Sequence, residues 1–256
     1  MNKITVGKSI IVKPKSKVYG SVSYLSNNKK AISIDDTGRV SAKSPGTAKI
    51  TVSVSGNQNY KSATTTMVLT VLPKDTEILL LDNISNGIQI NWEKNKHASG
   101  YYIYRSKDGN NFKKVAGINS GAITKWTDSK AATNGSRYSY KIVAYTKIGN
   151  SIYKSSESRV KYFYYMSTPT VKSVSNYRVD GILVRWSKNS KASGYEIKYI
   201  LDSKPKVIRV NKGSSEIGII RKLKKGKRYS ISVRSYKKIG SRRYYSNWSK
   251  VKRVKH

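Results

Sequence analysis

Apolar and polar residues alternate along much of this chain, and the alternation is plainest over residues 48–54, where Ala48, Ile50, Val52 and Val54 are separated by polar residues. A period of two gives a strand one buried and one wet face, as in an antiparallel sheet packed on one side. Other runs rich in Val, Ile, Thr and Tyr are broken by Gly, Asn, Asp and Pro clusters about every 8 to 12 residues. The pattern predicts many short strands and no long amphipathic helix.

A long segment is also written twice. Residues 87–103 recur as residues 181–197, and residues 138–149 recur as residues 229–240. A repeat of about 90 residues is a whole small domain rather than one turn of a solenoid. Because the second pair of segments is three residues closer than the first, a loop between them is expected to be shorter in the second copy.

The first section, to about Leu72, has an acidic turn at Asp35 to Gly38, a small-residue stretch to Ala42, and a strand start at Gly46-Thr47-Ala48. With these features it resembles the bacterial Ig-like group 2 modules.

The two repeats resemble fibronectin type III modules. Each has an early strand tryptophan, an Ala-Ser-Gly-Tyr entry to the next strand and a Gly-x-x-Tyr entry to a later one. The tryptophans are Trp92 and Trp186, and the later tyrosines are Tyr138 and Tyr229. The ending around Tyr244 and Trp248 is also similar to the last strand of that family. The resemblance implies that both tryptophans fill the core between two sheets, and that both tyrosines are structural, with hydroxyls that return to the backbone upstream.

We therefore expect an all-β fold of three tandem immunoglobulin-like antiparallel β-sandwiches. The expected domains are a bacterial Ig-like domain at residues 1–73, a fibronectin type III domain at 74–167, and a strongly basic fibronectin type III domain at 168–256.

The chain offers little for catalysis. It has no cysteine, only two histidines, and thirteen scattered acidic residues. A glycosidase needs two carboxylates across a cleft, and none of the usual nucleotide, hydrolase or metalloprotease motifs is present. The Asp35-Asp36 pair is explained by a turn without Ca²⁺. We expect a protein that is not an enzyme, with no catalytic residue, cofactor or metal.

Some aromatic residues remain as candidates for contact. Trp126 and Trp248 are expected near sandwich edges, where packing is favoured over ligand stacking. The run Tyr162 to Tyr165 is the best candidate for an exposed patch, although packing at a domain junction explains it as well.

Charge is the sequence feature that most strongly indicates a function. The chain has 51 Lys plus Arg against 13 Asp plus Glu, a net charge of +38. Residues 1–72 carry +9, residues 73–166 carry +8, and residues 167–256 carry +21. Three basic groups make up the candidate polyanion-binding residues: a first group of Arg221, Lys222, Lys224, Lys225, Lys227 and Arg228; a second of Lys237, Lys238, Arg242 and Arg243; and a third of Lys250, Lys252, Arg253 and Lys255. Since the last two strands of this fold are neighbours, we expect the second and third groups to lie close together and the first at the opposite end.

Such charge predicts an anionic partner. An anionic wall polymer or host polysaccharide is favoured over nucleic acid, for which no recognition motif appears. The leading hypothesis is a non-catalytic, monomeric part of a secreted or bacterial cell-surface protein that acts in adhesion. One alternative is a secreted ligand of a host protein receptor, and another is a passive spacer of a larger hydrolase. No stretch is apolar enough for membrane insertion. Because Met1 leads directly into a strand pattern, we expect that, if the protein is exported, this sequence is a processed or cloned piece.

Overall fold

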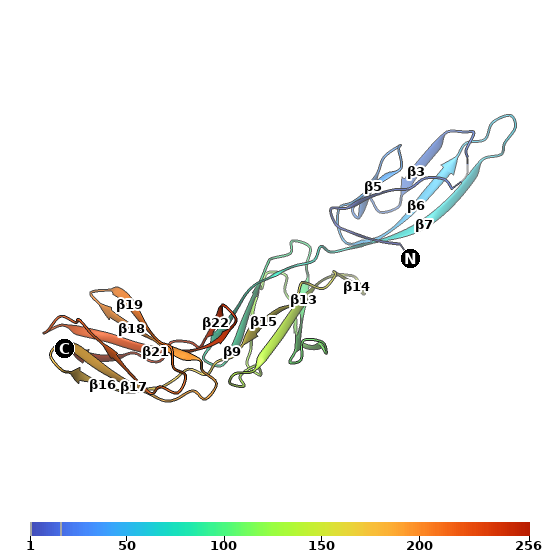
Figure 1. Cartoon of the computed structure of the whole chain (residues 1–256). Helices are drawn as coiled ribbons and strands as arrows, with labels where there is room; N and C mark the ends of the chain where they lie inside the picture. The colour runs from blue at the N-terminus through green and yellow to red at the C-terminus, as the bar shows by residue number, and fades with distance from the viewer. Residues whose placement is uncertain (1, 16) are drawn as a thin grey trace.

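The computed structural model describes residues 2–15 and 17–256, and every helix or strand assigned within them is a β-strand. The all-β class predicted from the alternating pattern is therefore confirmed. The strands form three sandwiches of two sheets each, which follow one another along the molecule (Figure 1). We name them the N-terminal, middle and C-terminal modules.

The N-terminal module has a four-stranded and a three-stranded sheet. The first has the order β1 (Asn2–Thr5), β7 (Ala63–Leu72), β6 (Gly46–Val54) and β3 (Val22–Ser26), with β1 parallel to β7. The second has the order β2 (Ser9–Ile11), β5 (Arg39–Ala42) and β4 (Ile32–Ile34).

The middle module pairs a three-stranded sheet with a five-stranded one. The three-stranded sheet has the order β12 (Lys125–Asp128), β9 (Gly87–Trp92) and β8 (Ile78–Ile84). The other has the order β11 (Lys113–Ile118), β10 (Gly100–Ser106), β13 (Arg137–Ile148) and β14 (Ser151–Lys154), and β15 (Lys161–Tyr164) also pairs with β13.

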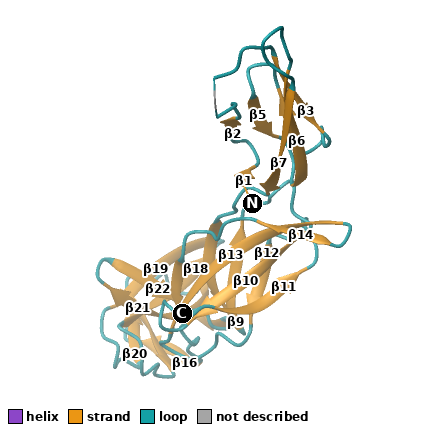
Figure 2. Ribbon diagram, turned by 90° about the vertical axis from the view of Figure 1, so that its right-hand side faces the viewer, coloured by secondary structure: helices purple, strands orange, loops and turns teal. Residues whose placement is uncertain are grey.

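The C-terminal module repeats this topology strand for strand. Figure 2 shows that all three modules consist of strands joined by loops. Its three-stranded sheet has the order β16 (Val171–Tyr177), β17 (Gly181–Trp186) and β20 (Ile217–Ile220). Its five-stranded sheet has the order β19 (Lys204–Val210), β18 (Gly194–Leu201), β21 (Arg228–Ile239) and β22 (Arg242–Tyr245), with β23 (Lys252–Lys255) beside β21. The sequence repeat is thus a repeat of one whole sandwich.

Each module has its own hydrophobic core. Trp92 and Trp186 are buried between the two sheets of their modules, each against the tyrosine that opens the next strand. Tyr138 and Tyr229 are also buried. Their hydroxyls accept hydrogen bonds from backbone N–H groups five residues upstream, at 3.3 Å in the middle module and 2.9 Å in the C-terminal module. The single-residue domain boundaries at 73/74 and 167/168 stay predictions.

Tyr244, on strand β22 of the β21–β22 hairpin, joins the C-terminal module to the middle module. It is buried in the core of the middle module, with its ring centroid 5.3 Å from that of Phe163 and 5.0 Å from that of Tyr164. Asn83 of β8 donates a hydrogen bond of 2.5 Å to the backbone carbonyl of Tyr245. Side chains of the candidate aromatic patch, Tyr162 to Tyr165, therefore pack at this junction, and Phe163 and Tyr165 are buried.

Candidate polyanion-binding surface

The first basic group lies on the loop between β20 and β21 and ends at Arg228, the first residue of β21, and all six of its side chains are exposed. Two left-handed residues bend this loop sharply, Lys222 with φ of 59° and Gly226 with φ of 72°. The buried hydroxyl of Tyr229 holds the backbone N–H of Lys224 at 2.9 Å. A fixed backbone hence presents these flexible cationic side chains to solvent.

The third basic group lies beside the first. Strand β23 runs antiparallel to β21, so that Lys255 pairs with Arg228 and Arg253 pairs with Ser230. The expectation that the third group joins the second is therefore wrong. The expectation fails because β23 and β21 are antiparallel, which places the last residues of β23 against the first residues of β21. Lys250 lies closer to the middle of β21, since the neighbouring Ser249 N–H donates to the carbonyl of Val233.

We define the tip cluster as the cationic side chains at this end of the C-terminal module, away from the middle module and beside the C-terminus (Figure 1). Its members from the predicted groups are Arg221, Lys222, Lys224, Lys225, Lys227, Arg228, Lys252, Arg253 and Lys255.

The second group lies at the other end of β21, next to the middle module. Three of its four members lie near aromatic rings: the ammonium of Lys237 is 5.4 Å from the ring centroid of Tyr164, and the guanidinium of Arg242 is 5.0 Å from that of Tyr244. Arg243 lies 5.5 Å from the centroid of Tyr236. We name this group the hairpin cluster, and its contacts help to hold the junction between the modules.

Sequence reasoning missed cations that other strands bring to the tip. Arg178, in the turn between β16 and β17, lies 5.3 Å from the centroid of Tyr177, and Arg221 lies 5.8 Å from the same ring. Lys204, at the start of β19, pairs with Leu201 at the end of β18, which lies beside the start of β21. Only the strand order shows that Arg178 and Lys204 lie at this end of the module, so the sequence alone could not place them there.

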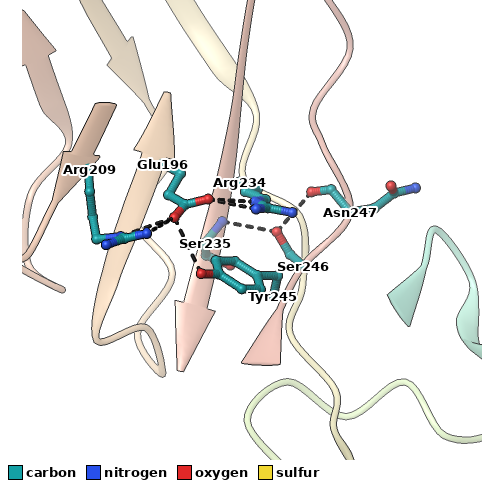
Figure 3. Close-up of polar contacts among 7 residues, drawn as sticks. All are labelled: Glu196, Arg209, Arg234, Ser235, Tyr245, Ser246 and Asn247. Carbon is teal, nitrogen blue, oxygen red and sulfur yellow. Dashed lines mark hydrogen bonds and ion pairs between the residues drawn. The ribbon is translucent and has the colours of Figure 1, made fainter. Parts of the chain in front are cut away.

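Other cations of the C-terminal module are neutralised internally. Glu196 of β18 is buried between Arg209 and Arg234, whose guanidinium nitrogens donate to its two oxygens at 2.6 to 3.0 Å (Figure 3). Burial alone would raise the pKa of the Glu196 carboxyl, but the hydrogen bonds from the two arginines outweigh it, so the pKa lies below its usual value. Both arginines are therefore held as parts of a structural network.

The two candidate edge tryptophans have packing partners. Trp248 lies over the guanidinium of Arg234 at 4.3 Å, and Tyr245 lies over the same group at 3.9 Å. Trp126 is half-buried against the core of the middle module. These contacts indicate that both tryptophans have a structural role.

The carboxylate of Asp35 forms hydrogen bonds within its own turn. It accepts hydrogen bonds from the hydroxyl and the N–H of Thr37 and from the N–H of Arg39. These bonds, led by the one from the Thr37 hydroxyl, lower the pKa of the Asp35 carboxyl. Among residues 2–15 and 17–256, no three His, Asp or Glu side chains are grouped closely enough to hold a metal ion.

No helix long and apolar enough to cross a bilayer occurs in the part of the chain that the structure describes.

Two family models match the chain. Residues 5–74 match the bacterial Ig-like domain (group 2), and residues 167–252 match the fibronectin type III domain. The chain therefore carries a bacterial Ig-like module followed by a fibronectin type III module, as the sequence resemblance predicted. The middle module has the topology of the C-terminal one. Modules of these families are typically non-catalytic and are typical of extracellular or surface proteins.

Individual relatives are distant. A Kelch domain-containing protein of Sulfurisphaera tokodaii is 32% identical over 147 residues, which is 57% of this chain but 18% of that protein. The FN1–FN3 domains of chicken CNTN1 are 15% identical with a TM-score of 0.38, covering 85% of this chain and 79% of that one. The two-domain fibronectin type III segment of chicken tenascin is 18% identical with a TM-score of 0.31, covering 72% of this chain and 99% of that one.

Proposed function

We propose that the C-terminal module binds anionic polymers, such as acidic wall polymers or host acidic glycans, through the tip cluster. The chain then serves as a non-catalytic array of modules in a secreted or cell-surface protein. In this arrangement the basic tip lies at one end of the molecule, and the middle and N-terminal modules follow toward the other end (Figure 1).

The observation that carries this proposal is that the tip cations lack acidic partners. None of the tip-cluster side chains forms an ion pair among the described residues, whereas Arg209 and Arg234 share Glu196. Asp180, in the β16–β17 turn at this end, accepts the backbone N–H of Lys222 at 3.4 Å rather than a cationic group. Like charges at this density repel each other and raise the energy of the folded module. A bound polyanion relieves that repulsion.

The chemistry of the cluster suits a flexible polymer of repeated negative charges. Most of the cations are lysines, which act as mobile point charges, while bidentate arginines favour defined planar anions. They come from a loop, a strand end and two turns, so they surround the tip rather than line a pocket. Such a surface attracts sulfated, carboxylated or phosphorylated polymers through a field that salt screens.

Two variants with equal loss of charge test the proposal. The tip variant carries Lys222→Gln, Lys224→Gln, Lys225→Gln and Lys227→Gln, and the hairpin variant carries Lys237→Gln, Lys238→Gln, Arg242→Gln and Arg243→Gln. Binding to heparin and to isolated Gram-positive walls is measured at physiological salt, after thermal unfolding has established that both variants are folded. Since exposed charge pairs contribute about 0.2–1 kcal/mol each, the tip variant should lose on the order of tenfold or more in affinity.

The hairpin variant should stay within about threefold of the wild type, because its four cations lie at the opposite end of β21 from the tip cluster and three of them lie near aromatic rings. Equal losses of affinity in the two variants would mean that the positive field of the whole chain, rather than the tip cluster, holds the polymer. Binding to animal cells that is saturable and insensitive to salt and glycan removal would favour a protein receptor instead.

A further inference from the structure

A hollow on the side of the middle module, lined by aliphatic and cationic side chains, is not accounted for by polyanion binding. Leu79 and Leu80 of β8 are 61% and 53% exposed, although both are large aliphatic residues. Together with Leu81, Val160, Lys161, Tyr162 and Arg242 they line a pocket of about 230 Å³. We name it the leucine pocket. It lies at the junction of the modules, because Arg242 comes from the β21–β22 hairpin.

The repeat provides an internal control for these leucines. The strand β8 has an irregularity in its pairing with β9 between Ile78 and Leu80, and β16 has the same irregularity between Val171 and Ser173. Leu79 and Leu80 therefore correspond to Lys172 and Ser173 in the C-terminal module. The same backbone thus accepts a lysine and a serine at the two positions.

A second contact confirms this correspondence. The ammonium of Lys161 donates to the carbonyl of Leu79 at 3.3 Å, and the ammonium of Lys252 donates to the carbonyl of Lys172 at 3.0 Å. Since the backbone and its capping lysine are alike in both modules, the fold does not require the two exposed leucines. A contiguous exposed apolar patch that the fold does not require marks a surface for contact, and Leu79, Leu80 and Val160, which line one pocket, form such a patch.

The charges around the pocket indicate the partner. Lys161 and Arg242 are its charged lining residues, and neither forms an ion pair within residues 2–15 and 17–256. A second copy of the chain is disfavoured because each copy carries a net charge of +38. Sugar rings stack best on free aromatic faces, but the guanidinium of Arg137 lies 4.4 Å from the ring centroid of Tyr162. Aliphatic lining with a cationic rim fits an apolar side chain flanked by carboxylates.

We propose that the leucine pocket docks an apolar side chain of an acidic partner protein. This is an interaction separate from polyanion binding at the tip, because Leu79 and Leu80 lie on the middle module. Arg242 engages a carboxylate next to the docked side chain, and Leu79 and Leu80 remove that side chain from water.

The test uses the whole chain and a set of acetylated, amidated pentapeptides. Each peptide has two acidic residues on either side of a central Leu, Phe, Val or Ser. The test variant is Leu79→Lys with Leu80→Ser, which installs the residues of the C-terminal module. The control is Ile123→Lys, which adds the same charge at a residue of the middle module that is 47% exposed and outside the pocket. Affinity is measured by NMR titration at low salt.

We expect the wild type and the Ile123→Lys control to bind the best of the three apolar peptides about tenfold more tightly than the serine peptide, since burial of one such side chain contributes that much. The double variant should lose this preference, while its binding to heparin stays unchanged. Equal binding of apolar and serine peptides by the wild type would overturn the proposal. So would leucine-dependent binding to phosphatidylglycerol vesicles without peptide preference, or leucine-dependent dimerisation in sedimentation experiments.

Discussion

Glu196 holds together the centre of the largest sheet in the C-terminal module. The alternating pattern places it on the outer face of β18, where the repeat has Tyr102 in the middle module. The sequence therefore gives no sign that Glu196 is buried. Arg209 and Arg234, from the two neighbouring strands, cover its carboxylate, and the hydroxyl of Tyr245 lies 3.3 Å from it. Only the register of four strands, β18, β19, β21 and β22, brings these groups together.

Replacing Glu196 with Gln should destabilise the C-terminal module at pH 7 by about 2–3 kcal/mol. A fully buried pair costs about 3–5 kcal/mol when one partner is removed, and the partial exposure of the two arginines reduces that figure. Because the pKa of Glu196 is lowered on folding, its contribution is complete above the unfolded value of 4.5 and is lost as the pH falls through the folded value. The gap in stability between wild type and Glu196→Gln should narrow below pH 4.5.

Urea unfolding of both proteins at pH 7 and at about pH 3 measures this gap. Glu216→Gln is the matched control, since Glu216 forms an exposed pair with Lys172 at 3.5 Å. It should change the free energy of unfolding by less than about 1 kcal/mol. A gap between wild type and Glu196→Gln that is the same at both pH values would contradict the assigned role.

At the scale of elements, hairpin β21–β22 shows what the sequence could and could not predict. The strands and the cores follow from the period-two pattern and the repeat, because each strand satisfies its own backbone and buries every second residue. The position of Tyr244 does not follow, since its side chain leaves its own sandwich for the core of another module. The adjacency of the first and third basic groups was mispredicted for a similar reason. Strand direction and register decide which ends meet, and composition carries no record of them.

Truncating Tyr244 to Ala should loosen the junction of the middle and C-terminal modules. Removal of a buried aromatic side chain costs about 3–5 kcal/mol, and here the loss falls on the contact between modules. Small-angle X-ray scattering should detect a wider range of interdomain angles, with both sandwiches still folded by circular dichroism. Tyr153→Ala is the control at the equivalent hairpin position, where the hydroxyl makes a 3.2 Å hydrogen bond to Thr47 of the N-terminal module.

That control should leave the junction between the middle and C-terminal modules unchanged. Scattering curves of Tyr244→Ala that superimpose on those of the wild type would show that the other contacts, such as the one from Asn83, are sufficient.

At the scale of the whole molecule, the cations differ in their surroundings as well as in the module that carries them. The total of +38 was evident from the sequence, and so was its concentration in the last ninety residues. The structure distinguishes three sets among those cations: Arg209 and Arg234 paired with Glu196, the hairpin cluster near aromatic rings, and the tip cluster exposed to solvent. The tip cluster lies at one end of the molecule, and the middle and N-terminal modules follow it in that order (Figure 1).

The most direct test of this account is a lysine footprint of the whole chain with and without heparin, by brief acetylation and mass spectrometry at physiological salt. Binding at the tip cluster should strongly protect Lys222, Lys224, Lys225, Lys227 and Lys255, with little change at Lys238 or at the exposed Lys29 and Lys30 of the N-terminal module. Protection spread evenly over all exposed lysines, or concentrated on the β21–β22 hairpin, would contradict binding at the tip.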